Sequence, residues 1–209
     1  MDDIYASRFS SWTPPSENIY ESPAISFTDA MFRRRLSQLS KMTIQVVHDL
    51  LPVEQGTKLF FLSFRGEITK QFSVNRMVIE ENTASPAAFS FSVFNTPIAL
   101  ASMAFGLKGG YSVIFPGNDS FITGLKTAQA ALLSGTENEL VFVYADEAVP
   151  KEFAGIALED SSPFAFAILL KRNNEPGFVP LSLIKKSGKD SAKSFLNQLL
   201  SYRDIYVSV

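Results

Sequence analysis

Side chains that could do chemistry are few in this chain. It has no cysteine and a single histidine, His48, which is followed directly by Asp49. A His–Asp pair needs a serine hydroxyl placed against the imidazole, and the sequence lacks the Gly-x-Ser-x-Gly turn that would present one. We therefore interpret His48 as a structural or exposed side chain rather than a catalytic base.

Other polar or glycine-rich clusters also have simple structural interpretations. Asp146 and Glu147 could form a paired-carboxylate site, but adjacent side chains should diverge, which favours a loop-forming role. Arg33–Arg35 could bind an acidic carrier protein, yet successive helix positions turn by about 100°, so the three cannot share one face. The pair Gly109-Gly110 is not followed by the lysine and hydroxyl residue of a phosphate-binding loop. Without cysteine, disulfides and thiolate metal sites are excluded.

The bulk properties of the chain argue against some classes of function. A net charge of −2 and a pI of about 5.5 give no electrostatic case for nucleic-acid binding. The first residues, MDDIYASRFSSWTPP, lack the basic and apolar regions of a signal peptide. Apolar runs such as Phe164–Leu170 are too short to span a bilayer. We expect a cytoplasmic protein with no membrane span and no nucleic-acid partner.

Phenylalanine is abundant in the chain, with 19 residues, whereas charged residues make up only 19% of the 209 positions. A Phe-rich core would account for this composition, and so would a large apolar interface or ligand channel; composition alone favours the core. The segment Ile98–Leu107 is rich in alanine, serine and glycine. Such small residues allow close backbone approach at a packed interface or beside a ligand.

The order of apolar runs, caps and breaking residues predicts a single α/β domain, 1–209. Residues 1–27 are expected to form an irregular arm with at most a short strand at Ala24–Phe27. The next predicted elements are a helix from the Ser26-x-x-Asp29 cap to Leu50, a buried strand at Lys58–Phe64, a helix over 67–83 and an extended piece ending near Phe94. A helix opened by Asn95-Thr96-Pro97, a central strand at Tyr111–Phe115 and a helix over 119–134 follow. The chain is then expected to form strands over 139–146 and 163–174, a short strand, a helix over 190–203 and an extended tail over 205–209. This alternation predicts a mixed sheet with buried helices.

Residues 117–135, GNDSFITGLKTAQAALLSG, resemble the strand-to-helix turn that carries the nucleophilic cysteine of ketosynthases, the condensing enzymes of fatty-acid and polyketide synthesis. The helix pattern of that family is matched at Ser120, Gly124, Leu125, Ala128, Leu132 and Gly135. Counting back from these matches puts Asn118, give or take one residue, at the nucleophile position. An amide cannot form the acyl thioester. The resemblance therefore implies a ketosynthase relative that does not carry the acyl chain covalently.

Further segments resemble the same family in the same order between Arg33 and Pro150, namely RRRLSQLSKM, FFLSFRGE, SPAAFSFSVFNTP and LVFVYADEAVP. Together they resemble the N-terminal domain of β-ketoacyl-synthase-like proteins, especially the small chain length factors that accompany aryl-polyene clusters. Phe94 is a departure, because the family commonly has histidine there. The resemblance implies a thiolase-like fold reduced to about half of the usual duplicated fold. The second half, which normally supplies two catalytic histidines, is then missing.

The resemblance also implies a partner. A full-length ketosynthase would pair with this chain in a heterodimer or heterotetramer, acyl carrier protein would be engaged through that partner, and no cofactor is implied. In the family, the strand before the nucleophile turn pairs with its counterpart in the partner, which predicts interface residues Tyr111, Ser112, Val113, Ile114 and Phe115. Candidates for lining the acyl or polyene tunnel are Phe91, Phe94, Met103 and Phe115, although core packing would explain any one of them equally well.

Two other classes of function remain open at this stage. The chain could be an enzyme with a non-cysteine site, such as an acyltransferase or a malonyl decarboxylase acting through the Asn118 amide. It could also be a self-associating binding module without a ketosynthase partner. Mass spectrometry after exposure to acyl or malonyl carrier substrates would test the former, and co-purification with a ketosynthase would test the latter.

Overall fold

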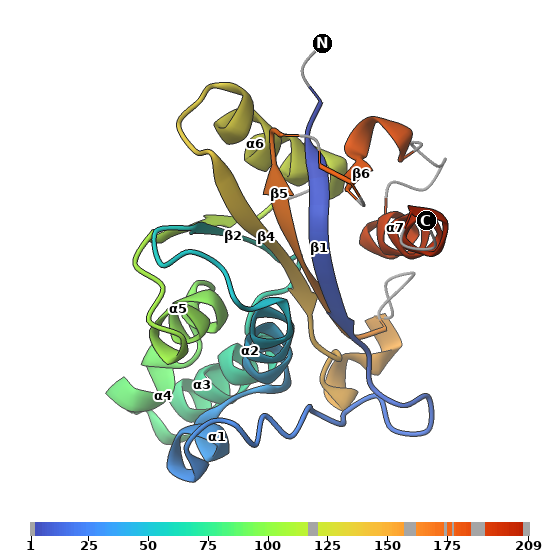
Figure 1. The fold of residues 1–209 in the computed structure, drawn as a ribbon. Coiled ribbons are helices and arrows are strands. Elements are labelled where there is room, and N and C mark those ends of the chain that lie inside the picture. Colours follow the sequence, from blue (N-terminus) through green and yellow to red (C-terminus); the bar gives the residue numbers. More distant parts are fainter. Residues whose placement is uncertain are drawn as a thin grey trace.

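A mixed six-stranded sheet forms the centre of the molecule in the computed structural model (Figure 1). The structure describes residues 3–116, 121–156, 162–173, 175–176, 178–184 and 191–206. The strands are β1 Tyr5–Trp12, β2 Lys58–Leu62, β3 Tyr111–Ile114, β4 Glu139–Asp146, β5 Phe164–Lys171 and β6 Val179–Pro180, in the spatial order β3-β2-β4-β5-β1-β6. Strand β2 is parallel to β3 and β4, whereas the other neighbouring strands pair antiparallel.

Helices cover both faces of this sheet (Figure 1). They are α1 Ala30–Arg35, α2 Gln38–Leu50, α3 Ile68–Glu81, α4 Pro86–Ser90, α5 Thr96–Ala104, α6 Phe121–Leu133 and α7 Ala192–Tyr206, with short 3₁₀ turns η1 Lys151–Ile156 and η2 Leu181–Leu183. Apolar residues of α2 and α5 form the core on one face, and those of α6 and α7 form the core on the other. The predicted mixed sheet with buried helices is confirmed. Within the described residues, no helix is both long and apolar enough to span a membrane.

Strands β4 and β5 are the most buried part of the sheet. All but the first residue of β4 and all but the last residue of β5 are buried. Their side chains alternate between the two cores, so that Phe142 and Phe166 face α6 and α7 whereas Val143 and Ala167 face α2. Coverage on both faces explains why these strands are nearly continuous apolar runs in the sequence.

The predicted long helix ending at Leu50 is in fact two helices. Leu36 and Ser37, between α1 and α2, have extended backbones. The Ser37 hydroxyl accepts the Ser40 N–H at 2.9 Å and so caps α2. Asp29 caps α1, whereas the expected capping box would have used Ser26 as the cap. Apolar spacing continues across the break, which is why periodicity alone did not reveal it.

The predicted irregular arm contains a strand, β1. Its sequence, YASRFSSW, has too few apolar residues to predict a strand. Two of its three serines are instead hydrogen-bonded to backbone carbonyls, with Ser7 Oγ donating to Leu169 O at 3.1 Å and Ser10 Oγ donating to Val46 O at 2.6 Å. The strand expected at Ala24–Phe27 is wrong, because the chain there is irregular and then turns.

Three further predictions are corrected. The extended piece before Phe94 contains the helix α4, which Ser85 caps by accepting the Ala88 N–H at 3.4 Å. The start of the expected extended tail belongs to α7, which continues to Tyr206. Strand β3 was expected in the centre of the sheet, but it lies at the edge and ends at Ile114. The prediction was wrong because a pattern of apolar residues shows which faces of a strand are buried and not whether both of its edges are paired.

Candidate functional site

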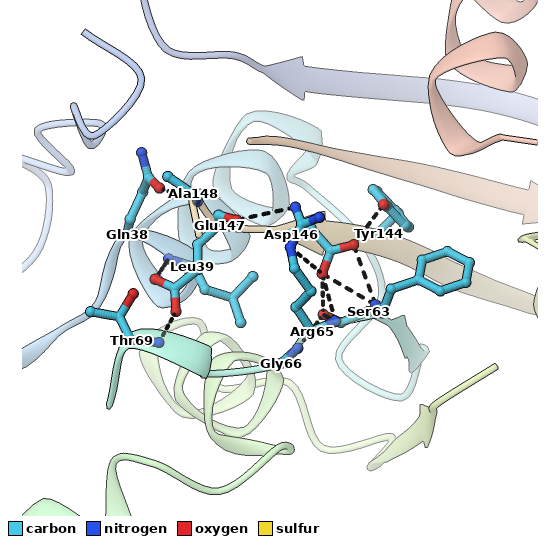
Figure 2. Close-up of polar contacts among 11 residues, drawn as sticks. Gln38, Leu39, Ser63, Arg65, Gly66, Thr69, Tyr144, Asp146, Glu147 and Ala148 are labelled. Atoms are coloured by element: carbon cyan, nitrogen blue, oxygen red, sulfur yellow. Dashed lines mark hydrogen bonds and ion pairs between the residues drawn. The ribbon is translucent and has the colours of Figure 1, made fainter. Parts of the chain in front are cut away.

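Buried polar side chains join the loops that follow β2 and β4 at the carboxyl edge of the parallel strands, where α/β proteins usually form their sites. Figure 2 shows this cluster, in which Ser63, Asp146 and Glu147 lie close to the backbone of neighbouring elements. Each of these side chains is at most 1% exposed. Buried polar groups require hydrogen-bond partners, and here most of the partners are backbone N–H groups of the loop after β2 and of the first turns of α2 and α3.

Asp146 organises the loop after β2. Its carboxylate accepts the hydroxyls of Ser63 and Tyr144, each at 2.7 Å, and also the N–H of Arg65 at 3.0 Å. The Ser63 hydroxyl in turn accepts the Gly66 N–H at 2.8 Å. The carboxylate is thus used to hold a turn rather than left available for acid–base chemistry.

Glu147 joins the beginnings of two helices. Its carboxylate accepts the Thr69 N–H of α3 at 3.0 Å and the Leu39 N–H of α2 at 3.4 Å. The backbone N–H of Ala148 then donates to the side chain of Gln38 at 2.8 Å. Asp146 and Glu147 therefore diverge and order separate loops, as predicted, and no group of metal-ligating residues is found in the described part of the chain.

Glu67 is a buried carboxyl group that the sequence did not single out. It is 1% exposed, and Ser40 Oγ donates to its Oε1 at 2.5 Å, whereas Oε2 has no hydrogen-bond partner among the described residues. Burial, followed by the charge of Glu147, raises the pKa of Glu67 to about 7. Burial likewise raises the pKa of Glu147. The available sequence signal for Glu67 was its place at the end of the motif FFLSFRGE, just past a buried strand.

An aromatic row runs from the core to the surface beside the edge strand β3. The Phe94 ring makes edge contacts with Phe61 at 6.2 Å and with Phe115 at 5.8 Å between ring centroids. Phe94 also covers Gly66, whose φ of +57° and closeness to the ring leave no room for a Cβ atom. The departure at Phe94 thus places a ring where it packs on the turn held by Ser63.

The predicted tunnel residues differ in exposure. Phe91 and Phe94 are half-buried, whereas Met103 is 76% exposed and Phe115 is 63% exposed. Met103 therefore does not fill the core of this chain. Exposed apolar side chains of this size are informative when they gather near an unpaired strand edge, and Met103 lies on α5, which contacts β3.

The predicted interface residues on β3 have two orientations. Val113 packs against the core that contains α2 and α5, and Ile114 packs against the core that contains α6 and α7. Tyr111 is exposed, and its hydroxyl accepts the Asn95 amide at 3.0 Å. Strand β3 pairs with β2 on one side, and on its other side no described strand is present.

The proposed nucleophile position, Asn118, lies outside the described residues, as does the expected helix cap at Asp119 or Ser120. The helix that follows, α6, buries four of the residues that match the family pattern, Gly124, Leu125, Ala128 and Leu132. Gly124 in that helix lies so close to Leu62 of β2 that a Cβ atom would collide with its side chain. This contact explains physically why a glycine stands at that position of the pattern.

The remaining candidates have structural or exposed positions. The His48 ring stacks on Phe27 with centroids 3.6 Å apart, and its Nδ1 lies 3.0 Å from Asp49 Oδ1. Arg33 donates to backbone carbonyls, while Arg34 and Arg35 are exposed at the end of α1.

The Gly109-Gly110 turn packs against the backbone of residues 56–57. Gly110 has a φ of +75°, a left-handed conformation that favours glycine. The pair therefore forms a tight structural turn.

The mixed sheet covered by helices on both faces is an α/β fold, and it matches the thiolase-like fold of ketosynthase-type chains. The model of the β-ketoacyl synthase N-terminal domain matches residues 9–201, and the chain belongs to this family. The predicted fold class and family resemblance are thereby confirmed. No significant match was found among curated proteins.

Solved structures with the same fold come from ketosynthase complexes. A chain from the complex between the ketosynthase ApeO and its chain length factor ApeC from Xenorhabdus doucetiae aligns with a TM-score of 0.71 and 20% identity, covering 82% of this chain and 79% of that chain. The ishigamide ketosynthase/chain length factor aligns with a TM-score of 0.64 and 11% identity, covering 81% and 62%. The complex AntDE:AntF, a type II polyketide synthase acyl-carrier protein with its ketosynthase bound to the hexaketide, aligns with a TM-score of 0.60 and 10% identity, covering 81% and 63%.

Proposed function

We propose that this chain is a non-catalytic subunit of the chain-length-factor type, which pairs with a full-length ketosynthase and forms part of the wall of its acyl or polyene tunnel. The observation that carries the proposal is the open edge of β3 together with the exposed Met103 and Phe115. Open strand edges pair readily with other strands, and natural proteins rarely leave apolar ones uncovered. Similarity to ketosynthase/chain length factor complexes supports the same assignment.

The composition and geometry support a subunit without condensing activity of its own. A condensing enzyme needs a thiolate nucleophile and donors that stabilise the oxyanion and enolate. This chain has no cysteine, and its one histidine, His48, is stacked on Phe27 and paired with Asp49. Asp146 and Glu147, at the carboxyl edge of the sheet, hold neighbouring backbone rather than offering a free acid or base.

The aromatic row supports the tunnel part of the proposal. Phe94 is fixed between Phe61 and Gly66, and it supports the exposed ring of Phe115 at the end of β3. A partner bound at this edge would cover Phe115 and pack against a rigid apolar surface. Phe91, half-buried and packed against the same core as Phe94, would extend that wall.

The partner we propose is a full-length ketosynthase in a heterodimer or heterotetramer, with acyl carrier protein engaged through that partner. The whole chain, 1–209, would act as one ketosynthase-like domain, and the assembly would work in the cytoplasm. The interface would include Tyr111, Ser112, Val113, Ile114 and Phe115. An obligate interface of this type buries upwards of roughly 2,000 Å².

Co-purification with a ketosynthase encoded nearby tests this proposal. We expect a 1:1 complex that Phe115→Glu weakens strongly, because a carboxylate would be buried without a partner in the interface. Met31→Glu is the matched control, since Met31 is 67% exposed on α1 and lies on a different element from β3 and α5. Because both side chains are exposed, neither change should unfold the chain. A failure to co-purify, or equal effects of the two substitutions, would contradict the proposal.

A further inference from the structure

The carboxyl group of Glu67 lies in the interior, where the loop after β2 meets the first turn of α2. Ser40 Oγ donates to its Oε1 at 2.5 Å, and Oε2 has no hydrogen-bond partner among the described residues. The residue is 1% exposed, so solvent does not supply the missing donor. An ionised carboxylate needs donors at both oxygens, and this environment therefore suits the protonated form better than the charged form.

The groups around Glu67 add little that would favour its charge. Those that act on it, from the largest effect down, are Glu147 from the loop after β4, Ser40 of α2, Ser37 at the cap of α2 and Lys70 of α3. Burial and the charge of Glu147 outweigh the two hydroxyls and Lys70, and the pKa of Glu67 is raised to about 7. The guanidinium of Arg65 is directed elsewhere, since it donates to Glu147 O at 3.1 Å and lies 4.0 Å from Asp146 Oδ1.

Glu67 is connected through its neighbour Gly66 to the aromatic row beside β3. Gly66 lies under the Phe94 ring, so close that a Cβ atom on it would be 2.5 Å from Phe94 Cδ2. The Phe94 ring in turn contacts the exposed Phe115 ring with centroids 5.8 Å apart. Gly66 N–H donates to Ser63 Oγ at 2.8 Å, so the turn is held by Ser63 on one side and by Glu67 on the other. Displacement of Glu67 from α2 therefore removes support from both rings.

We propose that the segment Gly66-Glu67 is a proton-sensitive switch that controls the apolar edge formed by Phe94 and Phe115. With Glu67 protonated, its carboxyl group stays on Ser40 and the two rings keep the arrangement that the ketosynthase partner binds. With the proton released to water, the carboxylate leaves the interior for solvent, the turn moves and the partner binds more weakly. This regulation rests on the proposed function, because it acts on the edge assigned to the partner.

Two-dimensional NMR spectra of the full chain, recorded without a partner between pH 6 and pH 8, test the switch itself. Ionisation of Glu67 should shift the backbone N–H of Gly66 with a midpoint near the pKa of about 7. The N–H of Phe115 should titrate with the same midpoint, which a purely local effect of the charge on its neighbour would not produce. Ile79, which is 81% exposed on α3, is the reference and should not follow this transition.

Glu67→Gln is the decisive variant for these spectra, because the amide keeps an acceptor for the Ser40 hydroxyl and cannot ionise. Both transitions should be absent from it. The proposal is overturned if Gly66 shows no transition in the parent chain, if Phe115 stays unchanged while Gly66 titrates, or if Phe115 titrates equally in Glu67→Gln.

The affinity for the ketosynthase at pH 6 and at pH 8 tests the consequence. The parent chain should bind about threefold more weakly at pH 8, within the roughly tenfold that the shifted pKa of Glu67 permits over this range. Glu67→Gln should abolish the difference, whereas Glu81→Gln, at the exposed end of α3, should retain it. Equal pH dependence of the parent and Glu67→Gln overturns the switch. Failure of every variant to bind at either pH contradicts the proposed function instead, and the NMR titration then decides on the switch.

Discussion

The buried carboxyl group of Glu67 should make the stability of this fold depend on pH. Its pKa is about 7 in the fold, against an ordinary value of 4.5 for a glutamate carboxyl group. Below pH 4.5 the group is protonated in both the folded and the unfolded chain. Between 4.5 and 7 only the unfolded chain releases the proton, so the free energy of unfolding falls as pH rises. At about 1.4 kcal/mol for each pH unit, the total loss is roughly 3 kcal/mol by pH 8.

Glu67→Gln should remove most of this loss. The amide keeps an oxygen to accept the Ser40 hydroxyl and carries no charge beside Glu147. Urea unfolding followed through the fluorescence of the single tryptophan, Trp12, should show similar stability of both proteins at pH 5. At pH 8 the variant should be the more stable, by up to about 3 kcal/mol.

The control for this experiment is Glu81→Gln, at the exposed end of α3, which should leave the pH dependence unchanged. The reasoning is refuted if Glu67→Gln is as pH-dependent as the parent chain. It is also refuted if the variant is less stable than the parent at pH 8, because the ionised carboxylate would then be stabilising the fold.

Other substitutions test the remaining parts of the account. Gly124→Ala should cost about 1–3 kcal/mol in urea unfolding because its Cβ collides with Leu62, whereas Gly56→Ala, with open space around it, should cost little. Glu147→Gln should lower the free energy of unfolding by about 1–3 kcal/mol even at neutral pH, since one amide oxygen replaces two acceptors; unchanged stability would show that these bonds contribute nothing. Asn118→Ala should leave condensation by the reconstituted complex largely intact, and Asn118→Cys should not give the isolated chain condensing activity; a large loss or a robust gain of product would make Asn118 a catalytic participant.

Much of the fold was predictable because its central strands are buried on both faces. The apolar runs of β2, β4 and β5 have no other simple interpretation, and Ser, Asp and Pro residues mark several helix starts. Strand β1 was missed because Ser7 and Ser10 are satisfied by distant backbone carbonyls, a tertiary effect that no local pattern contains. The break at Ser37 was missed because apolar spacing continues across it.

The site was predictable only in part, for a related reason. The divergence of Asp146 and Glu147 follows from their adjacency, but their partners lie on α2, α3 and the loop after β2. The unusual pKa of Glu67 depends on burial and on Glu147, which is far away in the sequence.

The most direct test of the central claim is the product-length distribution of the reconstituted ketosynthase complex, measured by mass spectrometry. Met103 is 76% exposed, so a change in its size should alter the tunnel wall with little effect on the stability of the fold. Truncating a buried methionine would instead cost roughly 2–5 kcal/mol of stability. The account predicts longer products with Met103→Ala and shorter products with Met103→Trp, with the complex still assembled. An unchanged distribution with an intact complex, for these variants and for Phe115→Ala, would contradict the claim that this chain shapes the tunnel.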